Sequence, residues 1–236
     1  MIQAVAEYNG GGYLIYAENF AGAFVRGKTK DEALSKFESE IKQYAHWAGL
    51  TLASDFSFDV RIVQEKESGL QICDADSDVI FDSEKLPLIR AEYGELKALA
   101  LKSARDFLAL YESVPNKTGT VLSPRKTFYG NMPLTADEMY SHTKNVNSYY
   151  FGEIGTEASN LPDILSCRRE GFAKLESSPF FLENAVYDGS YGEQWSLRKV
   201  CRRFIWHDRI HAKAIYKMSV KLCGKNSVSN PFCFNL

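Results

Sequence analysis

The spacing of hydrophobic residues changes near residue 83 of this 236-residue chain. Before that point, short stretches alternate between apolar and polar residues, which is typical of half-buried strands; these stretches are 2–8, 13–16 and 21–27. Asparagine and glycine at 9–12 predict a tight turn, because both tolerate positive φ. After residue 83, apolar residues recur every three or four positions, which favours helices. The pattern predicts two modules, an N-terminal module (residues 1–82) and a helical module (residues 83–236).

The N-terminal module also carries a helix signal. Thr29 and Glu32 have the spacing of a capping box, and an apolar stripe follows at helical spacing before Gly49: Leu34, Phe37, Ile41, Tyr44 and Ala48. Apolar residues then alternate with polar ones over 56–62, which predicts a fourth strand. Short strands are also expected at 70–72 and 79–81, around an acidic turn at 74–78. The order is βββαβ, and we expect a small antiparallel sheet with the helix on one face.

Three short motifs in this module resemble a known fold. They are Gly11-Gly12-Tyr13 before a strand, the approach to the helix at 25–29, and the helix start at 31–34. On these motifs, residues 2–65 resemble the HicB-like antitoxin fold, and this resemblance implies a module that binds a protein partner. No helix-turn-helix or ribbon-helix-helix pattern is visible in the sequence. We therefore carry over the fold and not the antitoxin role.

The helical module predicts four long helices, over 86–111, 135–155, 160–177 and 196–222. Thr135 and Glu138 form a capping box at the start of the second helix. Asn160 is the expected cap of the third, with Pro162 in its first turn, and Ser196 (or Ser190) is the expected cap of the fourth. Four helices of this length predict a bundle, and the whole chain is therefore expected to be α+β. The tail 226–236 is expected to be irregular and to dock through its two phenylalanines.

Three of the four histidines fall on the apolar faces of predicted helices. His207 and His211 are four apart in the fourth helix and continue its apolar stripe, while His142 fills a gap in the stripe of the second. Helical residues four apart share one face, so a third imidazole from a facing helix would complete a three-nitrogen set. Such a set with an open fourth position is typical of a catalytic divalent metal. Core packing and a surface pair remain alternatives, because this spacing is common by chance.

The sequence around these histidines resembles a second family. The motifs are Glu138-Met139-Tyr140-Ser141-His142, and the block 195–200 leading into 206–211. On these motifs, residues 83–223 resemble the DinB/YfiT-like superfamily of metalloenzymes. The resemblance implies a four-helix bundle in which His142, His207 and His211 hold zinc or nickel. It also implies a small-molecule substrate, with a low-molecular-weight thiol as one option, and a transferase or hydrolase reaction on a metal-activated thiol or water. Many related bundles form dimers, so a homodimer is one expectation.

Other polar residues near the predicted site have weaker signals. Asn145, Tyr149 and Glu153 share the second helix with His142 and are candidates for supporting the ligands, with ordinary packing as the alternative. Asp208 points about 100° away from its ligand neighbour and is expected to pair with Arg209 or Arg203. No catalytic residue beyond the ligands is assigned from the sequence.

Charge is distributed unequally between the modules. Residues 1–82 hold 7 Lys and Arg against 14 Asp and Glu, a balance of −7, and residues 83–236 hold 21 against 16, a balance of +5. The acidic first module counts against nucleic-acid binding, which depends on neutralising phosphates. A basic outer face is expected on the fourth helix, with two arginines added by the third: Arg198, Arg202, Arg209, Lys213, Lys217, Lys221, Arg168 and Arg169. Such a face is either merely solvated or attracts an anionic substrate.

The remaining sequence features concern the location of the protein and a rival function. Five scattered cysteines contain no CxxC pair, which favours reduced thiols and a cytoplasmic protein: Cys73, Cys167, Cys201, Cys223 and Cys233. The start lacks the pattern of a signal peptide, and no apolar run is long enough to span a membrane. The rival function is a protein-binding or regulatory module, in which the N-terminal sheet recruits a partner and the bundle is structural.

Overall fold

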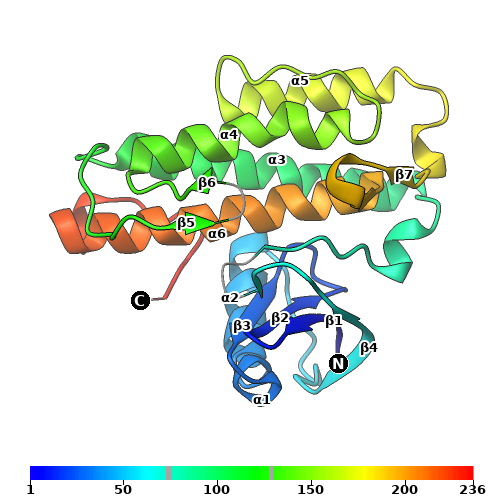
Figure 1. Ribbon diagram of the computed structural model, residues 1–236, viewed down its shortest axis with the longest axis horizontal. Helices are drawn as coiled ribbons and strands as arrows, with labels where there is room; N and C mark the ends of the chain where they lie inside the picture. Colours follow the sequence, from blue (N-terminus) through cyan, green and yellow to red (C-terminus); the bar gives the residue numbers. More distant parts are fainter. Residues whose placement is uncertain (73–75, 128–129, 236) are drawn as a thin grey trace.

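The computed structural model describes residues 1–72, 76–127 and 130–235. Four long helices lie side by side, and a small sheet with its two helices packs beneath the longest of them (Figure 1). The α+β class expected from the sequence is therefore confirmed. Cys73 and the start of the predicted acidic turn lie outside the described residues.

The sheet has four strands in the order β3-β2-β1-β4. Their bounds are Ile2–Asn9 (β1), Gly12–Ala17 (β2), Phe24–Gly27 (β3) and Val60–Glu67 (β4). The first three are antiparallel neighbours, and the predicted turn at 9–12 is confirmed by the pairing of Asn9 with Gly12. The prediction of a wholly antiparallel sheet is wrong, because β4 runs parallel to β1. A helical crossover between β3 and β4 brings the chain back in the same direction, as a parallel connection requires.

The predicted helix of the N-terminal module is divided into α1 (Lys30–Leu34) and α2 (Phe37–Ala48). Thr29 caps α1 as predicted, accepting a hydrogen bond from the backbone N–H of Glu32 at 3.2 Å. Gly49 ends α2 with a φ of 72°. The strand predicted from residue 56 begins only at Val60, because the phenylalanines before it turn towards each other, with ring centroids 5.2 Å apart.

Both faces of the sheet are buried at its two central strands, β1 and β2. One face packs against α2 through Ala4, Ala6 and Ile15. The other face, with Leu14 and Tyr16, packs against Ile72, Val79 and Phe81 and against Trp206 of the long C-terminal helix. The prediction of strands at 70–72 and 79–81 is wrong. These residues instead cover the second face of the sheet with apolar side chains.

The four long helices are α3 (Arg90–Ser113), α4 (Ala136–Gly152), α5 (Ile164–Glu176) and α6 (Leu197–Cys223). Helices α5 and α6 each pack against both α3 and α4. Thr135 and Ser196 are the caps of α4 and α6, as predicted. The prediction for α5 is wrong, because Asp163 caps that helix, while Asn160 instead accepts a hydrogen bond from the backbone N–H of Ser148.

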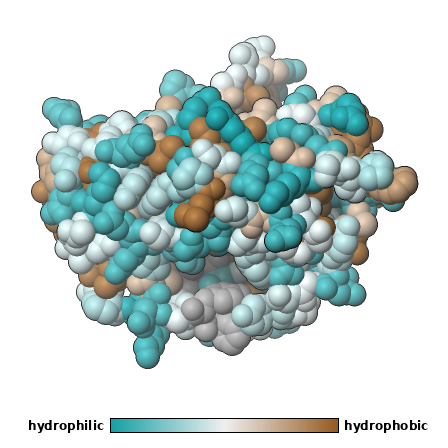
Figure 2. Space-filling view, turned by 90° about the horizontal axis from the view of Figure 1, so that it is seen from above, coloured by the Kyte–Doolittle hydropathy of each residue, from teal (hydrophilic) through white to brown (hydrophobic). Residues whose placement is uncertain are grey.

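Short elements connect these helices. They are the 3-10 turns at Asp82–Lys85, Phe181–Glu183, Ser190–Gly192 and Lys225–Ser227, and two small hairpins, β5 (Lys126–Thr127) with β6 (Gly130–Asn131) and β7 (Tyr187–Asp188) with β8 (Gln194–Trp195). Within the described residues, no helix combines the length and the apolar character needed to cross a bilayer. Seen from above, the surface is mainly hydrophilic, with apolar residues scattered over it (Figure 2).

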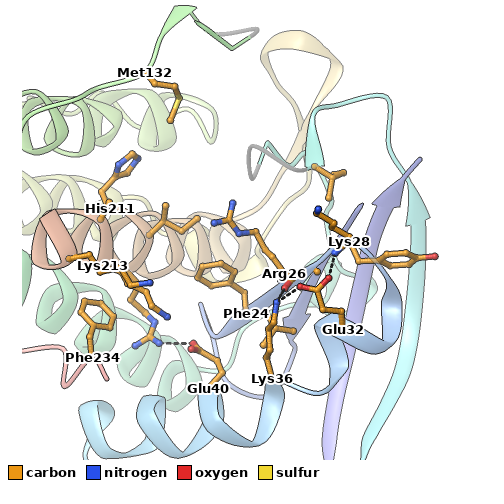
Figure 3. A pocket seen from close by; sticks show the side chains of 18 of the residues that line it. Phe24, Arg26, Lys28, Glu32, Lys36, Glu40, Met132, His211, Lys213 and Phe234 are labelled. Carbon is orange, nitrogen blue, oxygen red and sulfur yellow. Dashed lines mark hydrogen bonds and ion pairs between the residues drawn. The ribbon is translucent and has the colours of Figure 1, made fainter. Parts of the chain in front are cut away.

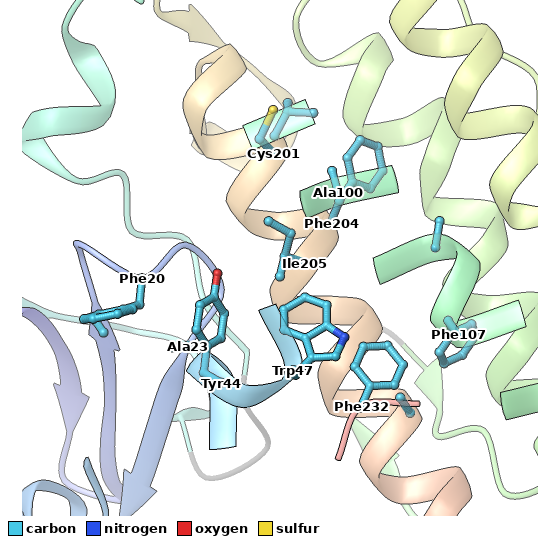
Figure 4. Close-up of a cluster of buried hydrophobic side chains, with 14 of the residues drawn as sticks. Phe20, Ala23, Tyr44, Trp47, Ala100, Phe107, Cys201, Phe204, Ile205 and Phe232 are labelled. Carbon is cyan, nitrogen blue, oxygen red and sulfur yellow. The ribbon is translucent and has the colours of Figure 1, made fainter. Parts of the chain in front are cut away.

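A continuous apolar core joins the two modules. The indole N–H of Trp47, on α2, donates to Asp106 on α3 at 2.8 Å, and the ring stacks on Phe232 of the tail, with centroids 5.4 Å apart (Figure 4). The predicted docking of the tail is confirmed, because Phe232 and Phe234 are both buried. The two predicted modules therefore share one interior.

Gly22 lies where the sheet module comes closest to α6. Its φ is 86°, and an added Cβ would come within 2.5 Å of the Ile205 side chain. Gly22→Ala is expected to destabilise the protein by about 3 kcal/mol, from the left-handed backbone and the clash together. Gly49→Ala is the matched control, because Gly49 also has positive φ but has no atom within 4 Å of the added Cβ. Urea unfolding should show a clearly smaller loss for the control, and equal losses would contradict the close approach.

Glu7 is a buried carboxyl on the second face of the sheet. Burial, and then a hydrogen bond with the Asp78 side chain, raises the pKa of Glu7 from 4.5 to about 7. The unfolded chain therefore releases this proton near pH 4.5, whereas the folded chain holds it to about pH 7. Between these two values, the free energy of unfolding falls as pH rises. Glu7→Gln should match the wild type near pH 4.5 and exceed its stability by on the order of 3 kcal/mol at about pH 8. Thermal unfolding at both pH values tests this, with exposed Glu67→Gln as the control; the same pH slope in Glu7→Gln and wild type would refute it.

Candidate metal centre

Three histidines converge between α4 and α6. His142 comes from α4, and His207 and His211 come from α6. The Nε2 atoms of His142 and His207 are 3.1 Å apart, and one ligand atom from each of the three rings lies within 4.8 Å of the others. The ring centroids are separated by 4.6 to 5.0 Å. The structure thus brings together the three residues that the sequence singles out.

Local packing positions these rings. The spacing of four places His207 and His211 on one side of α6, and α6 packs against α4 where His142 projects. Tyr150, also on α4, lies between Trp195 and Phe204 and contacts the His207 ring at 6.1 Å between centroids. This aromatic packing restricts the rotation of α6 relative to α4.

Burial keeps the imidazoles neutral. It lowers the pKa of His207 well below its usual value, and the neighbouring His211 and His142 lower it further. Burial, and then the charge of His142, lowers the pKa of His211 to about 3, and partial desolvation of the ring by its neighbours also lowers the pKa of His142. A neutral imidazole has a lone pair available for a metal. Three clustered neutral rings therefore form a donor set without first having to lose protons.

One nitrogen–nitrogen separation in the cluster is close to that of a tetrahedral metal site. Zinc–nitrogen bonds of about 2.0–2.1 Å place two ligand nitrogens roughly 3.3 Å apart in a tetrahedron. The 3.1 Å between the Nε2 atoms of His142 and His207 is close to this value. Nδ1 of His207 is buried and, within the described part of the chain, has no hydrogen-bond partner. The three imidazoles could therefore hold one metal ion.

Two cavities reach the histidines from outside. A cavity of about 1030 Å³ is lined partly by His211, and one of about 730 Å³ is lined partly by His142. Arg125 and residues 132–134 line both cavities, and Met132 lies above His211 in the larger one (Figure 3). His142 is exposed, whereas His207 and His211 are only 8% and 7% exposed. Small molecules therefore have access to the cluster from the α4 side and from the larger cavity.

The residue next to His207 has a structural role. Asp208 points away from the cluster and accepts hydrogen bonds from Arg168 of α5 at 2.5 and 3.2 Å, and both side chains are wholly buried. The expected pairing of Asp208 with Arg209 or Arg203 is wrong. Arg209 pairs with Glu40 of α2, and Arg203 lies beside Glu193. Adjacent residues on α6 face different neighbours, so they do not pair with each other.

The predicted basic outer face of α6 is also largely wrong. Arg202 and Arg209 are buried in ion pairs with Glu84 and Glu40, and Arg198 bonds to Glu92. The N-terminal module covers the side of α6 that an isolated bundle would expose to solvent. Of the predicted set, Lys217, Lys221 and Arg169 are the exposed residues.

The predicted supporting residues lie beside the site without touching its ligands. Tyr149 packs against Trp195, Glu153 accepts a hydrogen bond from the backbone N–H of Ser190 at 2.8 Å, and Asn145 is exposed. In the described part of the chain, none of the three makes a hydrogen bond or ring contact with a clustered histidine. The fourth histidine, His46, lies in the last turn of α2, outside the cluster.

No family model, curated protein or solved structure matches this chain. The resemblances noted from sequence motifs therefore remain predictions. The function must be inferred from the residues of the site.

The Asp208–Arg168 pair should be essential for stability. Asp208→Asn keeps the shape of the side chain but leaves the buried Arg168 without a counter-charge, which should cost about 3–5 kcal/mol. Replacing both partners with apolar residues, Arg168→Met with Asp208→Leu, should cost less than Asp208→Asn alone. Glu170→Gln is the control, because it breaks an exposed pair on α5 and should cost less than about 1 kcal/mol. Equal free energies of unfolding for Asp208→Asn and Glu170→Gln would contradict this role.

Proposed function

We propose that this protein is a divalent-metal-dependent enzyme whose metal ligands are His142, His207 and His211. The observation that carries the proposal is the convergence of three neutral imidazoles from two helices at a spacing that fits one ion. A set of three protein ligands leaves a position open for water or substrate, which is typical of catalytic rather than structural sites. The access through two cavities supports the same conclusion.

When bound, a divalent cation would lower the pKa of a water or thiol beside it and so supply a nucleophile near neutral pH. The residues around the histidines supply the rest of the site. Met132, Leu134 and Met139 line the cavity near His211 and reduce the amount of water around a bound substrate. The reaction class we propose is transfer or hydrolysis of a small molecule, with a low-molecular-weight thiol as one substrate. Zinc or nickel is the proposed metal.

Membership of the DinB/YfiT-like superfamily, with a HicB-like N-terminal module, is part of this proposal. The histidine motifs support it, together with the packing of four long helices around them. The cysteines of the described residues are free, which supports a reducing, cytoplasmic setting. The rival function, recruitment of a protein by the sheet, has less support because the chain itself covers both faces of the central strands β1 and β2.

Metal analysis tests the proposal directly. Protein purified without a histidine tag and incubated with zinc or nickel should retain about one ion per chain after dialysis. His142→Ala should lose most of it, because one of three ligands is gone, while folding should persist since His142 is exposed. His46→Ala is the matched control and should bind as the wild type does. Mass spectrometry of the bound metal gives the stoichiometry.

Two results would overturn the metal site. One is a wild type that retains as little metal as His207→Ala. The other is a loss of metal in His46→Ala as large as that in His142→Ala. Circular dichroism of each variant separates loss of a ligand from loss of the fold.

A further inference from the structure

The larger cavity is a cleft between the two modules. One side is formed by β3, α1 and α2, the other by α6, and Leu122, Ser123, Arg125 and residues 132–134 close part of it (Figure 3). His211 and Met132 lie at one end, and Arg26, Lys28 and Lys36 lie at the sheet side. The cleft thus continues from the histidine cluster to a surface formed by the N-terminal module.

The lining of this cleft is strongly positive. It contains seven cationic side chains and two carboxylates; the cations are Arg26, Lys28, Lys36, Arg125, Arg209, Lys213 and Lys217. Each carboxylate is already paired, Glu32 with Lys36 at 2.8 Å and Glu40 with Arg209 at 2.6 Å. Across residues 1–72, 76–127 and 130–235, no carboxylate lies within 4 Å of the ammonium groups of Lys28, Lys213 or Lys217. The cleft therefore keeps a net positive charge in a chain whose formal charge is −2.

The cations come from both modules. Arg26 and Lys28 are at the end of β3, whereas Lys213 and Lys217 are one turn apart on α6. Positive groups that converge on a concave site raise the local concentration of small anions. The N-terminal module is acidic as a whole, so this positive cluster is a local feature of the cleft and not a consequence of composition.

The cleft also has an apolar part close to the histidines. Phe24, Ile210 and Met132 line it, and the Phe24 ring rests edge-on against Trp206, with centroids 6.2 Å apart. A ligand that fits this lining has an apolar portion as well as negative charge. Pockets for small molecules commonly combine such apolar walls with a few charged groups.

We propose that this cleft binds a small organic anion carrying phosphate or carboxylate groups. Its anionic groups lie against the lysines that line the cleft, among them Lys28 at the sheet side and Lys217 on α6, and its apolar part lies between them against Phe24 and Ile210, beside His211. The role of this anion as a substrate rests on the proposed function. Its binding to the cleft does not depend on that proposal. A concave site between modules suits a small molecule better than a nucleic-acid backbone, which follows an extended positive surface.

Calorimetry with inorganic pyrophosphate and with citrate, used separately, tests the cleft. Both probes are titrated into full-length protein freed of metal, because both chelate divalent ions. Wild type should bind at least one of them, and the probe bound more tightly shows whether phosphate or carboxylate is preferred. The variant Lys28→Ala with Lys217→Ala removes two exposed charges and should bind roughly tenfold more weakly. Lys221→Ala is the matched control, on the same helix but outside the cleft, and should bind as the wild type does.

Three results would overturn the proposal: no binding of either probe, equal affinity in wild type and the double variant, or an equal loss in Lys221→Ala. Tighter binding of a duplex oligonucleotide than of either probe would also overturn it. Metal-free His142→Ala separates this test from that of the metal site. It should bind the probe as metal-free wild type does, even though it no longer retains zinc or nickel. If the protein retains metal but binds no anion, only the proposal for the cleft is refuted. If it binds the anion but retains no metal, only the proposal of a metal-dependent enzyme is refuted.

Discussion

The structure depends on the burial of most of α6 between the other long helices and the N-terminal module. This helix carries two of the clustered histidines, and five charged residues are buried with them: Lys199, Arg202, Arg203, Asp208 and Arg209. A buried charge is costly unless it is paired, so each of these residues requires a partner from a particular direction. Asp208 meets Arg168 of α5, Arg202 meets Glu84, and Arg209 meets Glu40 of α2. Rotating α6 about its axis would unpair several charges at once, and the pairs therefore determine that His207 and His211 face α4.

The same constraint joins the two modules. Glu40 belongs to the N-terminal module and Glu84 to the connection after it, and both neutralise arginines of α6. Trp206 of α6 completes the core on the second face of the sheet, against Tyr16 and Phe81. A bundle without the N-terminal module would expose these arginines and this indole to solvent. The two modules are therefore one folding unit in energetic terms, although their hydrophobic patterns differ.

Sequence reasoning succeeded where the signal is local. The caps at Thr29, Thr135 and Ser196 depend on one side chain and the next turn of its own helix, so they can be predicted from spacing. The histidine cluster could be predicted for a similar reason, because two ligands share one helix face and the third fills a gap in another apolar stripe. The metal itself and the DinB/YfiT-like and HicB-like resemblances are not tested by the fold.

The failures concern contacts between residues far apart in the chain. The parallel pairing of β4 depends on where a crossover returns, and the partner of Asp208 lies 40 residues earlier on another helix. The prediction of a basic outer face on α6 failed for the same reason. Its arginines lie on the polar side of the helix in the sequence pattern, but the N-terminal module covers that side. One signal was present at Glu40, a carboxylate next to the apolar Ile41, but nothing in the sequence says which arginine Glu40 or Glu84 would meet.

The covering of α6 also explains why the cleft is positive while the rest of the N-terminal module is acidic. Where α6 and the module touch, arginines are matched by carboxylates and buried. Beyond that contact, β3 and the last turns of α6 diverge, and Lys28, Lys213 and Lys217 extend into the space between them without counter-charges from the described residues. Lysine is strongly hydrated and remains charged at such a boundary, whereas arginine tolerates burial in pairs. The distribution of the two residue types thus follows the boundary between the packed contact and the open cleft, and the histidine cluster lies where these two regions meet.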